Sequence, residues 1–170
     1  GHPGRDVVEQ AIGLPLPAGR EQDFIDTARR VFAACYPDFA TTPDYTAVVN
    51  ERHFARLTGL VDEARTEGAE VVELVPGVVP DPTTRRFPPL LLSGVNAGMR
   101  VMQEEIFGPL LPLVPYGDLA QAIDYVNARP RPLALYYFDT DASAIATALD
   151  QTVSGGVTIN DTLLHIAQDD

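Results

Sequence analysis

Apolar residues recur at helical spacing in four parts of the chain, and short apolar runs lie between them. From Glu21 to Tyr36 they recur every three or four residues, which predicts an amphipathic helix. Asn50 is a typical N-cap residue and predicts a second helix that stops at Gly68. Further helices are predicted over residues 119–128 and 142–150. The apolar runs predict strands over residues 45–49, 71–74, 90–92, 111–116, 133–138 and 157–160.

Strands that alternate with helices predict an α/β fold, in which helices flank a mostly parallel sheet on both faces. Residues 1–20 are predicted to be an irregular N-terminal segment, because the prolines and glycines between Gly13 and Gly19 interrupt any regular helix. Residues 21–170 are predicted to form one domain, a length that buries a sizeable core.

Charge and composition argue against several classes of function. A formal net charge of −12 argues against nucleic acid, whose phosphates attract basic surfaces. All 12 basic residues are arginines, so a Schiff-base lysine and a Walker lysine are both absent. The single cysteine excludes an internal disulfide, and His2, His53 and His165 lack metal-ligand spacing. No apolar run approaches a membrane span and no signal peptide is visible, so we expect a cytoplasmic protein that binds neither membrane nor metal.

The stretch over residues 103–112 places two adjacent carboxylates before an apolar pair and a Gly-Pro turn. Gly108 tolerates backbone angles that are closed to other residues, and Pro109 disfavours the helical region for Gly108. Such a turn would present Glu105 and Phe107 rigidly at the start of a strand, where α/β proteins often bind ligands. A purely structural interpretation, a helix end followed by a turn and a strand, stays open.

Three segments extend this pattern: residues 99–116, 122–138 and 154–161, the last of which reads Ser-Gly-Gly-Val-Thr-Ile-Asn-Asp. Together they resemble the catalytic domain of aldehyde dehydrogenases, in particular the coniferyl-aldehyde-dehydrogenase-like branch, and the similarity is dense from about Arg85 to Asp170. The resemblance implies a truncated catalytic domain of that family. It also implies that Glu105 holds the ribose of a nicotinamide cofactor and that Phe107 packs beside it.

In that family a cysteine thiolate attacks the aldehyde and a glutamate activates water. The cysteine precedes an Ala-Pro-Asp-Tyr segment, which Thr42-Pro43-Asp44-Tyr45 resembles, so its place falls at Ala40 and the nucleophile segment is eroded. Cys35 is expected to be a small buried side chain, with a relocated nucleophile as the alternative. Glu9 stands at the spacing of the family's general base, and a surface carboxylate is its alternative interpretation.

Four titratable side chains are candidates for a different, cofactor-free chemistry. They are Glu104, Glu105, Asp161 and His165. Because the chain has no Gly-x-Gly-x-x-Gly, a self-sufficient NAD-dependent dehydrogenase is not expected. If the loss of two domains leaves open space, these carboxylates are expected to become buried and to have a raised pKa. Tyr45, Phe107 and Asn160 are the candidates for the pocket that would hold the ligand.

Three hypotheses for the function follow. The first is a repurposed domain that binds a small carbonyl or aromatic metabolite and catalyses acid–base chemistry, such as a cyclisation, isomerisation or dehydration, without a cofactor. The second is a non-catalytic binding or assembly subunit, which forms a homodimer or pairs with a full-length enzyme. The third is a fragment of an NAD(P)-dependent aldehyde dehydrogenase. NAD is expected as a cofactor only in this third case, in which the family function is retained.

Overall fold

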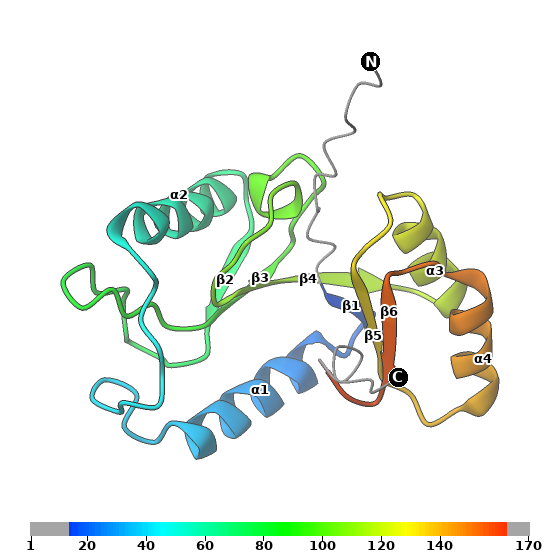
Figure 1. Cartoon of the computed structure of the whole chain (residues 1–170), viewed down its shortest axis with the longest axis horizontal. Coiled ribbons are helices and arrows are strands. Elements are labelled where there is room, and N and C mark those ends of the chain that lie inside the picture. Colours follow the sequence, from blue (N-terminus) through cyan, green and yellow to red (C-terminus); the bar gives the residue numbers. More distant parts are fainter. Residues whose placement is uncertain (1–13, 163–170) are drawn as a thin grey trace.

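The computed structural model describes residues 14–162 (Figure 1). The α-helices are α1 (Glu21–Cys35), α2 (Glu51–Thr66), α3 (Leu119–Asn127) and α4 (Ala142–Gln151), and η1 (Arg100–Met102) is a short 3-10 turn. The strands are β1 (Leu14–Pro17), β2 (Glu70–Glu73), β3 (Leu90–Ser93), β4 (Leu110–Tyr116), β5 (Ala134–Tyr137) and β6 (Gly156–Ile159). All four predicted helices are confirmed.

The described strands form two sheets. The larger sheet has the order β1-β4-β3-β2, and β4 is parallel to both β1 and β3. The smaller sheet pairs β5 with β6, also in parallel. Only β2 runs antiparallel, to β3. Two parallel strands that follow each other in the chain need a long crossover, usually a helix. The segment between β2 and β3 contains no helix, which agrees with their antiparallel pairing. The predicted α/β class with a mostly parallel sheet is therefore confirmed, although the predicted single sheet is divided in two.

Helices cover both faces of the larger sheet. Along β3, Leu90 and Leu92 pack with the buried side of α2, whereas Leu91 packs with Ile25 of α1 on the opposite face. This alternation follows from the two-residue period of a strand. Figure 1 shows α1 and α2 on opposite sides of this sheet, and α3 and α4 beside β5 and β6. The sheet is thus fixed from two sides, which makes β4 a rigid base for the stretch that precedes it.

Two sequence predictions about short segments are wrong. Residues 14–17, predicted to be irregular, form the edge strand β1, a position that tolerates prolines because an edge strand need not donate every N–H. Residues 45–49, predicted to be a strand, pair with none of the described strands. Instead, Val48 exchanges hydrogen bonds with Arg85: its N–H donates to the Arg85 carbonyl at 2.9 Å, and Arg85 Nε donates to the Val48 carbonyl at 3.1 Å.

The start of α2 is fixed as predicted. The Asn50 side chain accepts a hydrogen bond from the His53 N–H at 2.8 Å and so caps the helix. After α2 ends at Thr66, Gly68 takes a φ of 98°, which only glycine adopts easily. Because the cap sets the register of α2, it also decides which side chains of this helix meet the stretch before β4.

Gly108 and Leu57 form the closest contact between that stretch and α2. A Cβ added to Gly108 would lie 2.6 Å from Leu57 Cδ2. Leu57 is fully buried in the core that α2 forms with β3, so it has no open space into which to retreat. Gly108 is therefore required by packing.

We expect Gly108→Ala to lower the free energy of unfolding by about 1–3 kcal/mol, because the methyl group overpacks a filled core. Gly59→Ala, in α2, is the matched control: its Cβ would meet nothing within 4 Å, and the change should raise the free energy of unfolding by about 0.5–1 kcal/mol. Urea denaturation of both variants measures the two values. Equal midpoints would show that α2 and the loop separate to admit the methyl group.

Candidate functional site

Three residues on one face of α2 each hold one residue of the loop that enters β4. The Arg56 guanidinium donates to the Ile106 carbonyl, and His53 Nε2 lies 2.6 Å from the Phe107 carbonyl. Leu57 packs on Gly108. Positions 53, 56 and 57 share a helical face because they are three and four residues apart. The Ile106–Gly108 loop is thereby fixed residue by residue.

Arg56 connects this loop to a carboxylate and to His53. Its Nη1 lies 3.3 Å from Glu104 Oε2, and its Nε donates to His53 Nδ1 at 3.4 Å. Since Nδ1 is then an acceptor, the proton of a neutral imidazole sits on Nε2, which donates to the Phe107 carbonyl. Arg56 therefore also orients His53.

Glu104 is bound in ion pairs, and its pKa moves opposite to the prediction. Arg100 donates to it through Nε at 2.8 Å and through Nη2 at 3.2 Å, in addition to the contact with Arg56. Hydrogen bonding from Arg100 is the largest cause that lowers the pKa of Glu104 below its ordinary value of 4.5. The predicted rise of this pKa through burial is wrong for Glu104. Glu105, the next residue, is partly buried.

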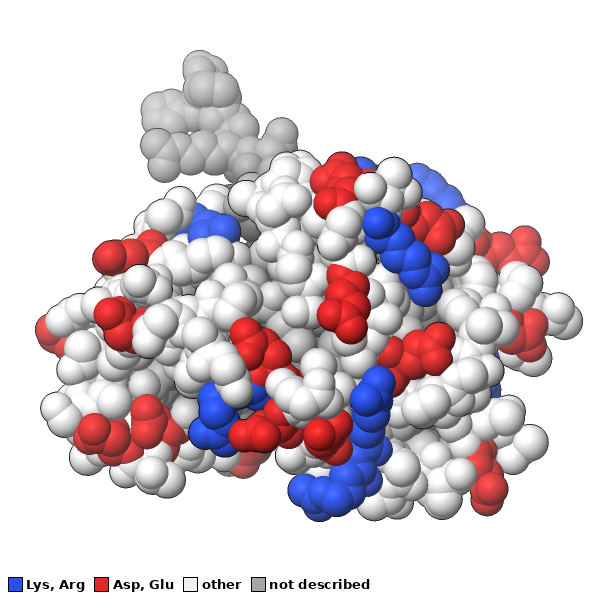
Figure 2. Space-filling view, turned by 180° about the vertical axis from the view of Figure 1, so that it is seen from behind, with Lys and Arg blue, Asp and Glu red and all other residues white. Residues whose placement is uncertain are grey.

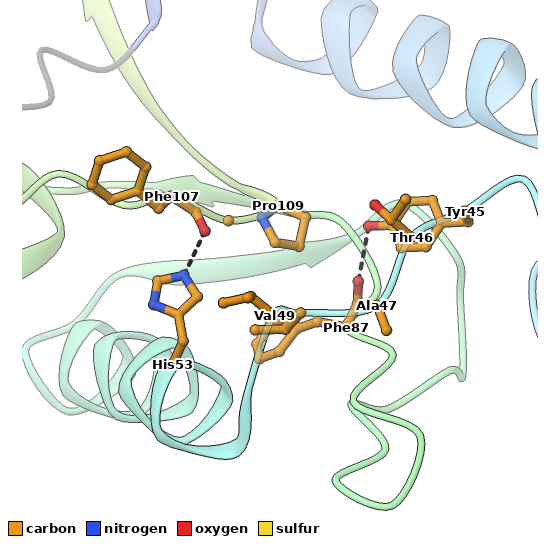
Figure 3. Close-up of a pocket in the computed structure, with 10 residues that line it drawn as sticks. Tyr45, Thr46, Ala47, Val49, His53, Phe87, Phe107 and Pro109 are labelled. Atoms are coloured by element: carbon orange, nitrogen blue, oxygen red, sulfur yellow. Dashed lines mark hydrogen bonds between the residues drawn. The ribbon is translucent and has the colours of Figure 1, made fainter.

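Phe107 combines a rare backbone conformation with an exposed ring. Its φ is 46°, in the left-handed region that bulky residues seldom adopt, and the residue is 69% exposed. Phe107 is one of the residues that line a cavity of about 480 Å³, together with Tyr45–Val49, Gly108 and Pro109. Its ring points away from Pro109 and Val49 (Figure 3). In Figure 3, His53 rises from α2 toward the Phe107 carbonyl. The structure thus brings two of the predicted pocket residues, Tyr45 and Phe107, to one cavity.

The opposite wall of the cavity is held by residues 85–87. The Tyr45 hydroxyl donates to the Phe87 carbonyl at 2.9 Å (Figure 3), and Arg86 donates to the carbonyls of Phe39 and Thr42. Burial is the main cause that raises the pKa of Tyr45 to about 12. Tyr45 therefore stays protonated at neutral pH and forms part of the wall.

The cysteine and the position assigned to the family nucleophile lie elsewhere. Cys35, at the last turn of α1, is exposed, so the prediction that it is buried is wrong. The reason is that α1 buries only one stripe against the sheet, with Ile25 as its buried residue. Ala40 is exposed in the turn that follows α1. Neither residue lines the cavity beside Phe107.

Asn160 and Asp161 lie at the end of β6 and do not line this cavity either. Both polar atoms of the Asn160 amide bind the backbone of Asp139: Oδ1 accepts from its N–H and Nδ2 donates to its carbonyl, each at 2.9 Å. Asp161 accepts from the neighbouring Thr162 N–H at 2.7 Å. Asn160 therefore ties the ends of β5 and β6 together. Glu9 and His165 lie outside the described residues.

His53 and Arg56 were not among the residues proposed from the sequence. A local signal was present, because Asn50 caps the helix and positions 53, 56 and 57 then share one face. Their partners are about 50 residues away in the chain, at Ile106 and Phe107. The spacing within a helix cannot show which distant segment packs against it.

The surface and the remaining side chains add little chemistry. On the face shown in Figure 2, acidic side chains are scattered with arginines among them. Within residues 14–162, no group of three His, Cys, Asp or Glu side chains is arranged to bind a metal ion. No described helix is both long enough and apolar enough to cross a membrane. The predictions about nucleic acid, membrane and assembly partners stay predictions.

The fold and the loop before β4 are those of a known class of enzyme. The aldehyde dehydrogenase family model matches residues 22–169, so the chain belongs to this family. It is 49% identical over 155 residues to a probable coniferyl aldehyde dehydrogenase of Pseudomonas aeruginosa, which covers 91% of this chain and 32% of that protein. A coniferyl aldehyde dehydrogenase of Pseudomonas sp. (strain HR199) is 42% identical over 156 residues, with the same coverage.

A solved structure agrees with this assignment. The substrate-bound state of Staphylococcus aureus AldH superposes with a TM-score of 0.80 at 35% identity, over 89% of this chain and 32% of that one. The predicted family and the predicted coniferyl-aldehyde-dehydrogenase-like similarity are therefore confirmed. The chain spans about a third of the length of these relatives, 32% of each.

The conformation of Phe107 predicts an unusual response to glycine. Phe107→Gly should be about 1 kcal/mol more stable than Phe107→Ala. Glycine avoids the cost of the left-handed backbone, and the greater freedom that glycine loses on folding offsets part of this gain. Phe138 is the matched control: it is also exposed, at 57%, but is not among the residues with a positive φ. There the order should reverse. Urea midpoints of the four variants test this, and an alanine variant as stable as the glycine variant at position 107 would contradict it.

The ion pairs of Glu104 predict a stability that depends on pH. Because its pKa is lower in the folded state, its contribution is present above the ordinary value of 4.5 and is lost as the pH falls through the lower folded value. Its side chain is 37% exposed, so we expect a contribution below about 1 kcal/mol. Glu104→Gln should lose less stability than the wild type between pH 6 and pH 3, as measured by urea midpoints. The exposed Glu67→Gln is the control, and its profile should follow the wild type.

Proposed function

We propose that this chain forms the cofactor-facing part of the catalytic domain of an NAD(P)-dependent aldehyde dehydrogenase. The observation that carries the proposal is the exposed ring of Phe107, which stands on a loop that three side chains of α2 help to fix beside a cavity, in spite of its rare backbone. Strained residues that the surroundings hold in place concentrate at ligand sites. Glu105 and Phe107 would meet the nicotinamide ribose and the cofactor, as the family resemblance implies.

The residues present fit a nicotinamide nucleotide. The cavity lining is mainly apolar or aromatic, with Tyr45, Phe87 and Phe107 among its residues, and such surfaces suit a planar ring. A bound NAD(P)+ would accept the hydride that leaves the aldehyde carbon. The balanced reaction converts aldehyde, NAD(P)+ and water to carboxylate, NAD(P)H and two protons. In this proposal the residues that line the cavity form one side of the cofactor site.

Cofactor-free acid–base chemistry has less support. Three of the candidate proton carriers lie within the described residues, namely Glu104, Glu105 and Asp161, and none of them lines the cavity. Glu104 is engaged by two arginines, and its pKa is lowered. An acid or base that works near neutral pH needs a pKa near that pH, which the ion pairs of Glu104 oppose.

The proposed reaction also needs a thiolate and a water-activating carboxylate. Cys35 is exposed at the end of α1 and lies outside the cavity lining. Ala40 stands at the place that the family resemblance assigns to the nucleophile, so in this proposal the chain supplies the cofactor-facing part of the site and no thiolate at that position. The aromatic cavity and the names of the relatives favour an aromatic aldehyde of the coniferyl type as substrate.

Titration of the 170-residue chain with nicotinamide mononucleotide tests the cofactor site. We expect binding with a Kd on the order of 1 mM, since half of a dinucleotide makes only part of the contacts. Phe107→Ala should abolish the saturation-transfer NMR signal, whereas Phe138→Ala, which removes another exposed ring at a position that does not line the cavity, should not. Adenosine monophosphate, which shares the ribose and phosphate, should give no comparable signal. No binding by the folded chain at 10 times that concentration would count against the proposal.

A segment exchange tests the reaction itself. The stretch of the Pseudomonas aeruginosa relative that corresponds to residues 85–162 of this chain is replaced by those residues, so that the relative keeps its own nucleophile segment. The chimera is then assayed for NAD(P)H formation with coniferaldehyde. We expect activity above that of the same chimera with Glu105→Gln. A folded, nucleotide-binding chimera without activity would favour a repurposed or non-catalytic domain instead.

A further inference from the structure

The carbonyl of Phe107 is bound by a histidine whose own position is restrained from three sides. The His53 N–H donates to the Asn50 side chain at 2.8 Å, which fixes the backbone of His53 at the first turn of α2. His53 Nδ1 accepts from Arg56 Nε at 3.4 Å, and Nε2 lies 2.6 Å from the Phe107 carbonyl oxygen. A ring restrained in this way can hold its acceptor in one place.

The Phe107 side chain contributes little to its own restraint. The residue is 69% exposed, so packing of the ring does not account for the left-handed backbone. Such a backbone costs about 1–2 kcal/mol for a residue with a Cβ. Arg56 and Leu57 fix the residues on either side, Ile106 and Gly108, but only His53 binds Phe107 itself among the hydrogen bonds found at this residue in the described chain.

We propose that His53 is a positioning residue for Phe107. With the proton on Nε2, the imidazole donates to the Phe107 carbonyl and restrains the backbone from which the exposed ring projects. The inference rests on the proposed function, in which that ring is the surface that a nicotinamide meets. His53 itself also lines the cavity, so its action through Phe107 is read from the Phe107 resonances as well as from the affinity.

Substitutions in the 170-residue chain separate positioning from general stability. We expect His53→Ala to weaken the binding of nicotinamide mononucleotide five- to tenfold and to shift the Phe107 Cα and Cβ resonances away from left-handed values. His53→Gln, whose amide can still donate to the carbonyl, should restore affinity to within twofold of the wild type. Arg52→Ala is the matched control, because Arg52 is an exposed neighbour on the same turn of α2.

Two of the measurements need no nucleotide and so test His53 independently of the proposed function. Long-range proton–nitrogen correlation should show protonated Nε2 and unprotonated Nδ1 for His53, assigned by loss of the signals in His53→Gln. A Nδ1-protonated ring, or unchanged Phe107 resonances in a folded His53→Ala chain, would overturn the inference. If both agree with it but no variant and no wild-type chain binds the mononucleotide, the proposed function fails while the restraint on Phe107 stands.

Discussion

The site depends on the guanidinium of Arg56. This one group contacts a carboxylate, a carbonyl and an imidazole nitrogen, which belong to Glu104, Ile106 and His53. Arginine can do this because its planar fork presents several fixed donors, whereas a lysine ammonium is a single point charge. Without it, the Ile106 carbonyl would lose its donor and His53 its orientation. The capped helix and the packed core beneath Leu57 give the guanidinium a fixed place from which to act.

Three residues other than glycine adopt a positive φ in the described chain, and they are held in different ways. Arg85 uses its own side chain to bind the Val48 carbonyl, and Asn160 uses its own amide to bind the Asp139 backbone. In each case the side chain helps to offset the backbone cost. Phe107 is restrained by His53, a residue of another element, and its ring stays largely exposed. The backbone of Phe107 is thus restrained while its ring stays exposed, which leaves the ring accessible to a ligand.

The sequence predicts local features of this protein better than distant contacts. The Asn50 cap, the four helices and a bend at Gly108 and Pro109 follow from residues close together in the chain, and all are present. The false strand at residues 45–49 shows the limit: an apolar run becomes a strand only if another strand pairs with it, and here Arg85 binds it instead. The exposure of Cys35 and the contact between α2 and the loop likewise depend on packing across the chain.

Every second residue of the motif from Glu104 to Gly108 contacts the scaffold. Residues 104, 106 and 108 serve the scaffold: Glu104 forms ion pairs, Ile106 is buried in the core with α2, and Gly108 packs on Leu57. Between them, Glu105 is partly buried, and Phe107, in its left-handed conformation, is exposed. These are the two positions to which the family resemblance assigns contact with the cofactor. Because these three residues are fixed against the scaffold, the two residues between them have little freedom, and Phe107 is held beside the cavity that it helps to line.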